Sequence, residues 1–218
     1  LDHPNIIKLY EYYITSRKIF FIMEICTGGE LFDKILEINY FSEGVAAHIM
    51  KQIFSVLSHC HERRIFHKDL KPENILIETQ QERNKEFFNI KVIDFGTNET
   101  LKHNITLREK TASSYYMSPE LILFKERQYN NKVNDTQVTE KTDIWSCGII
   151  LFILLCGSPP FNSESDEGVF NKIKEGVFSF KSDIWKKISN EAQSLIRQLL
   201  QVDYNKRPTA KEVLNHEW

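Results

Sequence analysis

The 218-residue sequence lacks the features that mark several broad classes of protein. Its most apolar run, Cys147 to Cys156, is ten residues long, whereas a membrane-spanning helix needs roughly 20. Lys and Arg number 28 against 30 Asp and Glu, so no excess of positive charge favours nucleic acid or an anionic membrane as a partner. The sequence has no internal repeat or low-complexity bias, and its 41% hydrophobic content indicates a folded chain with a buried core.

Cysteine is also scarce. Cys26, Cys60, Cys147 and Cys156 show no Cys-x-x-Cys spacing, so the sequence predicts neither a zinc site nor a disulfide framework. We expect buried free thiols in a reducing compartment, and therefore a cytoplasmic, intracellular protein.

Patterns of apolar residues predict a short β-rich beginning and a helical second half. The runs 9–13 and 19–24 flank a polar turn and predict a hairpin. Ser42 is placed to cap a helix whose apolar residues recur every three or four positions up to Cys60. Further helices are predicted at 144–156, which is apolar on every side, at 190–200, and after the capping box Thr209-x-x-Glu212.

Between these regions, short apolar runs predict strands at 75–77 and 90–93. The charged stretch 78–86 that joins them is predicted to be a surface loop. The segment 125–141 is polar and rich in Asn, Lys and Gln, so we expect a solvated, mobile insertion.

The residues with the clearest chemistry lie in two motifs near the middle of the chain. One reads His-Lys-Asp-Leu-Lys-Pro-Glu-Asn from His67, and the other is Asp-Phe-Gly from Asp94. In phosphoryl transfer a hydroxyl nucleophile needs a carboxylate that orients it and takes its proton, and Asp69 suits that role. Asn74 and Asp94 offer the hard oxygen ligands that Mg²⁺ prefers. Lys71 can neutralise negative charge near the transferred phosphate.

These motifs resemble those of the protein kinase family. Ser-Pro-Glu at 118–120 and Asp-Ile-Trp-Ser-Cys-Gly at 143–148 follow in the family's order, and the resemblance covers essentially all 218 residues. Lys71 in the catalytic loop resembles the serine/threonine branch. Gly-Gly-Glu-Leu-Phe-Asp at 28–33 and Lys-Arg-Pro-Thr-Ala at 206–210 look like the calcium/calmodulin-dependent and calcium-dependent kinase group.

The resemblance implies an α+β, protein kinase-like fold with a mainly helical C-terminal lobe and part of a β-rich N-terminal lobe. It implies ATP and Mg²⁺ as cofactors and transfer of the γ-phosphate to Ser or Thr hydroxyls of protein substrates. Asp69 would be the base and Lys71 the cation beside the phosphate. Asn74 and Asp94 would hold the metal.

The resemblance also assigns residues to a nucleotide pocket. Met23 would be a core residue first and the gatekeeper beside adenine second, the backbones of Glu24 and Cys26 would hydrogen-bond adenine, and Leu76 would pack beneath it. Glu30 and Glu73 would contact the ribose or a basic residue of the substrate. For Glu30, a plain solvated carboxylate is an equally good interpretation.

Other residues acquire supporting roles by position. Asp143 would brace the catalytic loop, and Glu120 would pair with Arg207. His67 and Phe95 are expected to be packing residues. We interpret His48, His59 and His61, which share one predicted helix, as structural.

Parts of the family pattern are absent from these residues. None of the eight glycines forms Gly-x-Gly-x-x-Gly, and nothing resembles the strand lysine that pairs with a helix glutamate. We therefore expect a partial kinase domain, with 1–25 as a remnant of the small lobe and hinge and 26–218 as the large lobe.

The activation segment departs from the family as well. Lys68 stands where most of the family has Arg, whose bidentate fork a lysine does not reproduce, so activation by phosphorylation is expected to be weaker or absent. Ser113 takes the position of a family threonine. Candidates for phosphorylation, which the sequence does not rank, are Thr106, Thr111, Ser113 and Ser114.

Two classes of function remain open: an active serine/threonine kinase and a pseudokinase that acts as a binding scaffold. A calcium sensor is excluded for these residues, because no Asp-x-Asp/Asn-x-Asp/Asn-Gly loop ending in Glu occurs. If calcium regulates the protein, we expect the sensor beyond Trp218 or on a partner such as calmodulin. No nucleic-acid or membrane partner is expected.

Overall fold

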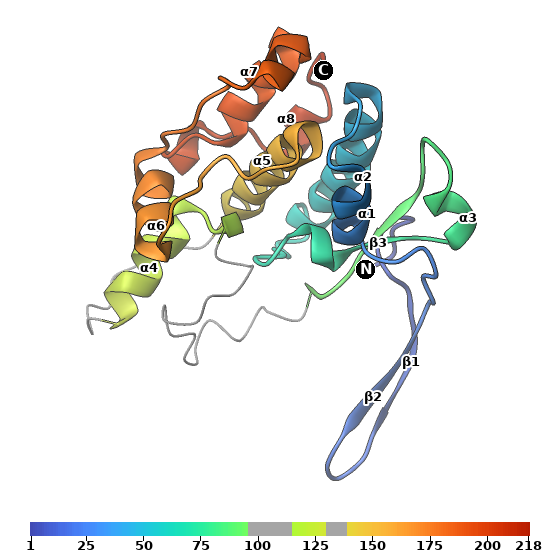
Figure 1. Cartoon of the computed structure of the whole chain (residues 1–218). Coiled ribbons are helices and arrows are strands. Elements are labelled where there is room, and N and C mark those ends of the chain that lie inside the picture. The colour runs from blue at the N-terminus through green and yellow to red at the C-terminus, as the bar shows by residue number, and fades with distance from the viewer. Residues whose placement is uncertain (96–114, 130–138) are drawn as a thin grey trace.

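The computed structural model describes residues 1–95, 115–129 and 139–218 (Figure 1). Among the described residues, short 3₁₀ turns lie at Pro72–Asn74, Asp183–Lys187 and Tyr204–Lys206. The strands and helices are, in chain order, β1 (Leu9–Ile14), β2 (Ile19–Met23), α1 (Leu31–Ile38), α2 (Glu43–His61), β3 (Ile75–Ile77), α3 (Gln80–Arg83), β4 (Ile90–Val92), α4 (Pro119–Tyr129), α5 (Lys141–Cys156), α6 (Asp166–Glu175), α7 (Asn190–Leu199) and α8 (Ala210–Val213).

Helix α5 forms the centre of the helical part. Every residue from Thr142 to Leu155 is buried, because a helix that is apolar on all sides must be surrounded by other protein. Helices α2 and α7 pack against it. The helix ends at Gly157, whose φ of 75° lies in the left-handed region that favours glycine. The prediction of a buried helix here is confirmed.

Helix α2 follows the predicted periodicity and carries the catalytic loop at its C-terminal end. The Ser42 hydroxyl accepts a hydrogen bond from the Val45 amide at 3.4 Å and caps the first turn. One face is buried throughout and packs against α5 and α8. The loop that begins after His61 is thus anchored to the core of the molecule.

Two antiparallel strand pairs differ in burial. In β3–β4 the residues Ile75, Ile77, Ile90 and Val92 are all fully buried. In the β1–β2 hairpin every residue is exposed, and the hairpin projects away from the helices (Figure 1). Both pairs occur where the sequence predicts strands.

The polar segments are more ordered than predicted. The stretch 78–86 contains helix α3, whose first turn is capped by the Thr79 hydroxyl accepting from the Glu82 amide. Helix α4 extends through 125–129, so the expected insertion is helical at its start. Its middle, 130–138, lies outside the described residues. Within the described ranges, no helix is long and apolar enough to cross a membrane.

Candidate active site

The loop after α2 brings together Asp69, Lys71 and Asn74. The Lys71 ammonium lies 2.9 Å from a carboxylate oxygen of Asp69. The side-chain amide of Asn74 donates to the backbone carbonyl of Asp69 at 2.8 Å and so closes the loop into a compact turn. Pro72, at the start of the 3₁₀ turn, fixes the backbone between them. The side chains of Asp69 and Lys71 stay partly exposed, at 28% and 17%, so a substrate can reach them.

Asp94 follows β4 on a neighbouring segment. The Ile93 amide donates to the Asn74 carbonyl at 3.0 Å, and the His67 ring bonds the Ile93 carbonyl at 2.9 Å. These contacts place the start of the Asp-Phe-Gly motif beside the catalytic loop. Asp94 is exposed and has a φ of 64°, a left-handed conformation that costs a non-glycine residue about 1 kcal/mol.

The donor set fits a magnesium ion. The side-chain NH₂ group of Asn74 donates within the loop, so the side-chain oxygen of Asn74 is the atom that can bind a metal. Asp94 supplies an exposed carboxylate. Mg²⁺ is commonly held by one or two protein oxygens together with phosphate oxygens and water. Among the described residues there is no cluster of three or more His, Cys, Asp and Glu side chains that would suit a different metal.

The segment after β2 is fixed by Glu24. Its carboxylate binds the Lys91 ammonium at 2.8 Å and accepts from the Lys8 amide at 3.2 Å. Burial raises the pKa of Glu24, but the bonds to Lys91 and Lys8 outweigh it and hold the pKa below its usual value. The Glu24 amide donates to the Lys8 carbonyl, so the predicted hydrogen bond from the Glu24 backbone to adenine would use the Glu24 carbonyl oxygen; the contact predicted for the Cys26 backbone stays a prediction.

Lys91 is a site residue that sequence reasoning missed. It lies in β4 between buried Ile90 and Val92 and is only 8% exposed. A lysine inside an apolar strand is a signal for an ion pair, since buried lysines are almost always paired. The sequence did not identify its partner, Glu24, which is far away along the chain.

The remaining predicted pocket residues lie around this segment. Glu30 and Leu76 form an isolated antiparallel bridge and are therefore neighbours. Cys26 is a half-buried free thiol, and burial raises its pKa. Met23 is 51% exposed at the end of β2, so the expectation that it packs first in the core is wrong. It belongs to the projecting hairpin, which has no core beneath it.

Glu73 is a half-buried carboxylate beside the loop. Burial is the main cause that raises its pKa, and the nearby carboxylates of Glu30 and Asp69 add to the effect. One of its oxygens is fully buried and has no hydrogen-bond partner among the described residues. A carboxylate in this state gains from a cationic or hydroxyl partner, as the predicted contact with ribose or a basic substrate residue requires.

Asp143 braces the catalytic loop from α5, as predicted. Its carboxylate accepts from the His67 amide at 2.9 Å and from the Lys68 amide at 2.7 Å. It is completely buried. Lys68 has a φ of 68°, so the carboxylate holds a strained residue directly before Asp69.

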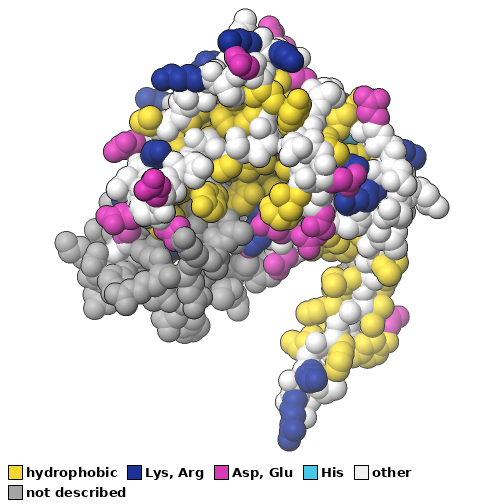
Figure 2. Space-filling model, in the orientation of Figure 1, with side chains coloured by type: hydrophobic (Ala, Val, Ile, Leu, Met, Phe, Trp, Pro, Cys, Tyr) yellow, Lys and Arg dark blue, Asp and Glu magenta, His cyan; other side chains and the backbone are white. Residues whose placement is uncertain are grey.

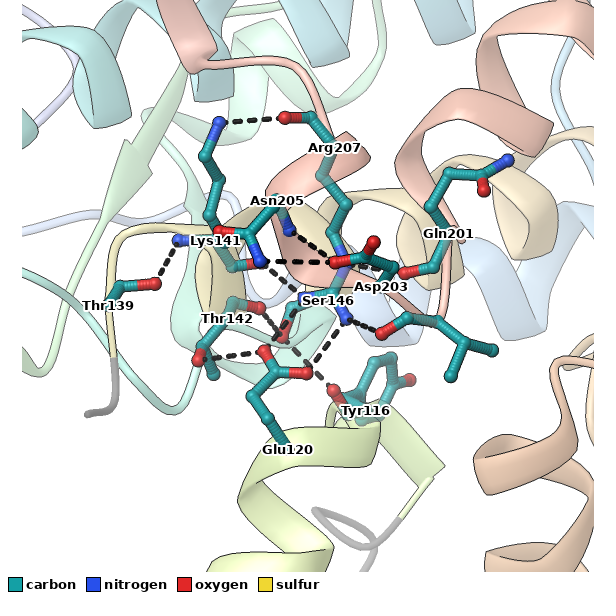
Figure 3. Close-up of polar contacts among 11 residues, drawn as sticks. Tyr116, Glu120, Thr139, Lys141, Thr142, Ser146, Gln201, Asp203, Asn205 and Arg207 are labelled. Carbon is teal, nitrogen blue, oxygen red and sulfur yellow. Dashed lines mark hydrogen bonds and ion pairs between the residues drawn. The ribbon is translucent and has the colours of Figure 1, made fainter. Parts of the chain in front are cut away.

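A second buried brace joins the end of the chain to α4 and α5 (Figure 3). Arg207 binds the Glu120 carboxylate through both terminal nitrogens, at 2.7 and 2.8 Å. Thr142 donates to the same carboxylate at 3.2 Å, and the guanidinium lies over the Trp145 ring. The predicted pair is confirmed, and it fixes the helix that follows the activation segment.

His67 and Phe95 contact each other with ring centroids 4.9 Å apart, and His67 is fully buried, so the predicted packing role is confirmed. Gly96 and the phosphorylation candidates Thr106, Thr111, Ser113 and Ser114 lie outside the described residues.

Comparison with known proteins agrees with this geometry. A family model described as "Protein kinase domain" matches residues 1–218. Calcium-dependent protein kinase 5 of Plasmodium berghei is 42% identical over 218 residues, covering 100% of this chain and 36% of the relative. Calcium-dependent protein kinase 14 of Arabidopsis thaliana is 41% identical over 217 residues, covering 100% of this chain and 38% of the relative.

The chain thus spans less than two fifths of the length of these relatives. The sequence matches agree with the fold described above, in which Asp143 braces the Asp69 loop and Arg207 pairs with Glu120. The chain belongs to the protein kinase family, within the serine/threonine kinases that resemble calcium-dependent protein kinases.

Proposed function

We propose that this chain carries the catalytic machinery of an ATP- and Mg²⁺-dependent kinase that phosphorylates Ser or Thr of protein substrates. The observation that supports it most is the cluster of Asp69, Lys71 and Asn74. A surface carboxylate beside a fixed ammonium and an amide oxygen combines a proton acceptor, a cation for the phosphate and a metal ligand.

The chain's own residues divide the reaction between them. Asp69 orients the substrate hydroxyl and takes its proton as the oxygen bonds to the γ-phosphorus and the bond to ADP breaks. Lys71 neutralises charge on the transferred phosphoryl group. Asn74 and Asp94 would hold Mg²⁺, which when bound neutralises the nucleotide phosphates. Glu30 and Glu73 would bind the ribose or a basic substrate residue.

The experiment is transfer of labelled phosphate from ATP to a basic Ser/Thr peptide by the complete polypeptide. Asp69→Ala is expected to lower kcat by roughly 100-fold or more, because general-base catalysis contributes about that factor. Asp183→Ala, which removes an aspartate whose side chain is 91% exposed, is the matched control and should keep wild-type activity. Unchanged activity in Asp69→Ala would overturn the assignment.

A pseudokinase scaffold is the second candidate. Lys68 in place of the family's arginine favours it, because a lysine does not reproduce the bidentate grip of arginine on a phosphate. A scaffold of this kind predicts no magnesium-dependent rise in melting temperature with ATP. A rise of several degrees in the complete polypeptide that needs both ATP and Mg²⁺ supports the kinase instead.

Two further proposals concern how the protein is regulated and where in the cell it works. The relatives are named as calcium-dependent kinases, and we propose that calcium regulates this protein through a sensor outside the 218 residues. The four free cysteines support our proposal that it works in the reducing environment inside the cell.

A further inference from the structure

The segment between β2 and α1 carries two of the predicted site residues, Cys26 and Glu30. Between them lie two adjacent glycines, which leave the backbone many alternative conformations. Gly29 has a φ of 80°, in the left-handed region. A Cβ at Gly28 would lie 2.6 Å from the side chain of Ile77 in β3. Contacts from outside the segment must therefore select the conformation that presents Cys26 and Glu30.

Backbone hydrogen bonds supply some of these contacts. The Gly28 amide donates to the Ile77 carbonyl at 3.2 Å, and the Ile77 amide donates to the Gly29 carbonyl at 2.8 Å. The Thr27 amide donates to the Glu78 carbonyl at 3.1 Å. None of these bonds uses the Gly28 carbonyl. Gly28 is buried, and a buried carbonyl needs a donor.

The side chain of Arg83 provides that donor. Arg83 belongs to α3, the short helix beside β3 (Figure 1). Its Nη1 donates to the Gly28 carbonyl at 2.9 Å, and its Nη2 donates to the Glu37 carboxylate in α1 at 2.9 Å. A Cβ at Gly29 would lie 3.2 Å from the same Nη1, so the absence of a side chain there gives the guanidinium room. One planar fork thus joins α3 to the glycine segment and to α1.

We infer that Arg83 is a positioning residue of the candidate active site, which fixes the segment carrying Cys26 and Glu30 through the Gly28 carbonyl and Glu37. The stretch 78–86, predicted from the sequence to be a surface loop, then has a role in the site. A lysine at position 83 would present a single ammonium in place of a fork, so it would not hold both partners in the same way.

The two bonds of Arg83 differ in strength. A hydrogen bond from Lys34 is the main cause that lowers the pKa of Glu37; burial opposes it, and Arg83 adds to the lowering. Glu37 is therefore ionised at neutral pH, but its side chain is 52% exposed, and solvent weakens an exposed ion pair. The Arg83 side chain is only 17% exposed and Gly28 is buried. The bond to the Gly28 carbonyl is therefore the stronger anchor.

The first test measures amide hydrogen exchange in the complete polypeptide. Arg83→Met keeps much of the length of the side chain and removes its donors. The amides of Thr27, Gly28 and Ile77 are expected to exchange about tenfold faster in this variant, while the amides inside α1 and α2 keep their rates. Lys85→Ala is the matched control. Lys85 pairs with Glu82 in the same loop and its loss should leave these amides unchanged.

Unchanged protection of the Thr27 and Gly28 amides in Arg83→Met would overturn the inference. So would a loss of protection that spreads evenly through α1 and α2, because that result indicates a role in packing only. If Arg83→Met does not fold, Arg83→Lys takes its place, since it keeps the charge and lacks the fork. Its exchange rates are expected to lie between those of wild type and the tenfold increase, and wild-type rates would contradict the inference.

The second test separates positioning from catalysis. In the complete polypeptide, Arg83→Met is expected to raise KM for ATP by about three- to tenfold while kcat stays within about twofold of wild type. The catalytic loop does not contact Arg83 through any of these bonds, so the chemical step should be preserved. A lower kcat with an unchanged KM would contradict the positioning role.

The prediction for KM rests on the proposed function, but the exchange measurement does not. If the polypeptide transfers no phosphate and the Thr27 and Gly28 amides still depend on Arg83, the positioning role stands and the proposed activity fails. If Asp69→Ala abolishes transfer and Arg83→Met leaves these amides protected, the activity stands and the positioning role fails.

Discussion

At the scale of single residues, buried charges hold the candidate active site in place. Glu120, Asp143 and Lys91 are all buried, and each meets an opposite charge or several donors. A buried ion pair adds little to the free energy of unfolding, but removing one partner leaves an unpaired buried charge that costs about 3–5 kcal/mol. The loop geometry therefore depends on complete sets of partners.

These sets also determine how stability changes with pH. Burial raises the pKa of Glu120, but the Arg207 guanidinium outweighs it and lowers the pKa below the usual 4.5. A carboxyl whose pKa falls on folding stabilises the protein fully above its unfolded value, and the contribution is lost as pH falls through the folded value. Asp143, whose pKa is also lowered, acts in the same direction.

We therefore expect Glu120→Gln to lower the free energy of unfolding by about 3–5 kcal/mol at pH 7. The difference from wild type should shrink as pH is lowered below about 4.5, because the Glu120 carboxyl of the unfolded wild-type chain then binds a proton before that of the folded chain does. Urea denaturation at a series of pH values measures both effects. Glu164→Gln, at an exposed position, should match wild type throughout. A difference that stays constant down to pH 3 would contradict the account.

The side-chain pairings that sequence reasoning missed share one physical property. Lys91 and its partner Glu24 belong to segments far apart in the chain, and His61 and Asp143, whose side chains are hydrogen-bonded, are separated by 82 positions. Their pairing depends on how the elements pack and leaves no local pattern. For Asp69, Asn74 and Asp94 the sequence allows a role to be proposed, because their chemistry is carried by short contiguous motifs.

At the scale of elements, local signals predicted α2, α5, α7 and α8 but not α1, α4 or α6. The Ser42 cap, the Thr209 capping box and the apolar run ending at Gly157 each mark a helix boundary that the structure confirms. Helix α3 was missed because its four residues are too few for periodicity to show. The exposure of β1–β2 was also unpredictable, since a strand pattern does not reveal what covers it.

Gly157 offers a test of one such boundary. A Cβ at this position would lie 2.5 Å from the Asn39 carbonyl oxygen, and the φ of 75° is unfavourable for other residues. We expect Gly157→Ala to lower the free energy of unfolding by more than about 1 kcal/mol. Gly44→Ala in α2, where the nearest atom is 3.9 Å away, should be neutral or stabilising. Thermal denaturation compares the two, and equal melting temperatures would contradict the boundary argument.

At the scale of the whole molecule, the helical body and the β1–β2 hairpin differ in how far their apolar side chains are buried. Figure 2 shows hydrophobic side chains along the projecting hairpin, where Tyr12, Phe21 and their neighbours are about half exposed or more. Contiguous exposed apolar surface of this kind is typical of an interaction surface. The catalytic loop and its braces, by contrast, are built into the buried body around α5.

The central claim is that Asp69 accepts the proton of the substrate hydroxyl, while Asn74 and Asp94 bind Mg²⁺. The most direct test measures phosphate transfer by the complete polypeptide as a function of Mg²⁺ concentration. We expect Asp69→Asn to lower the plateau by roughly 100-fold without changing the Mg²⁺ concentration at half-maximum. Asp94→Asn should raise that concentration about tenfold or more, since a neutral amide is a weaker ligand than a carboxylate. An Asp94→Asn variant with the wild-type requirement for Mg²⁺ would contradict the account.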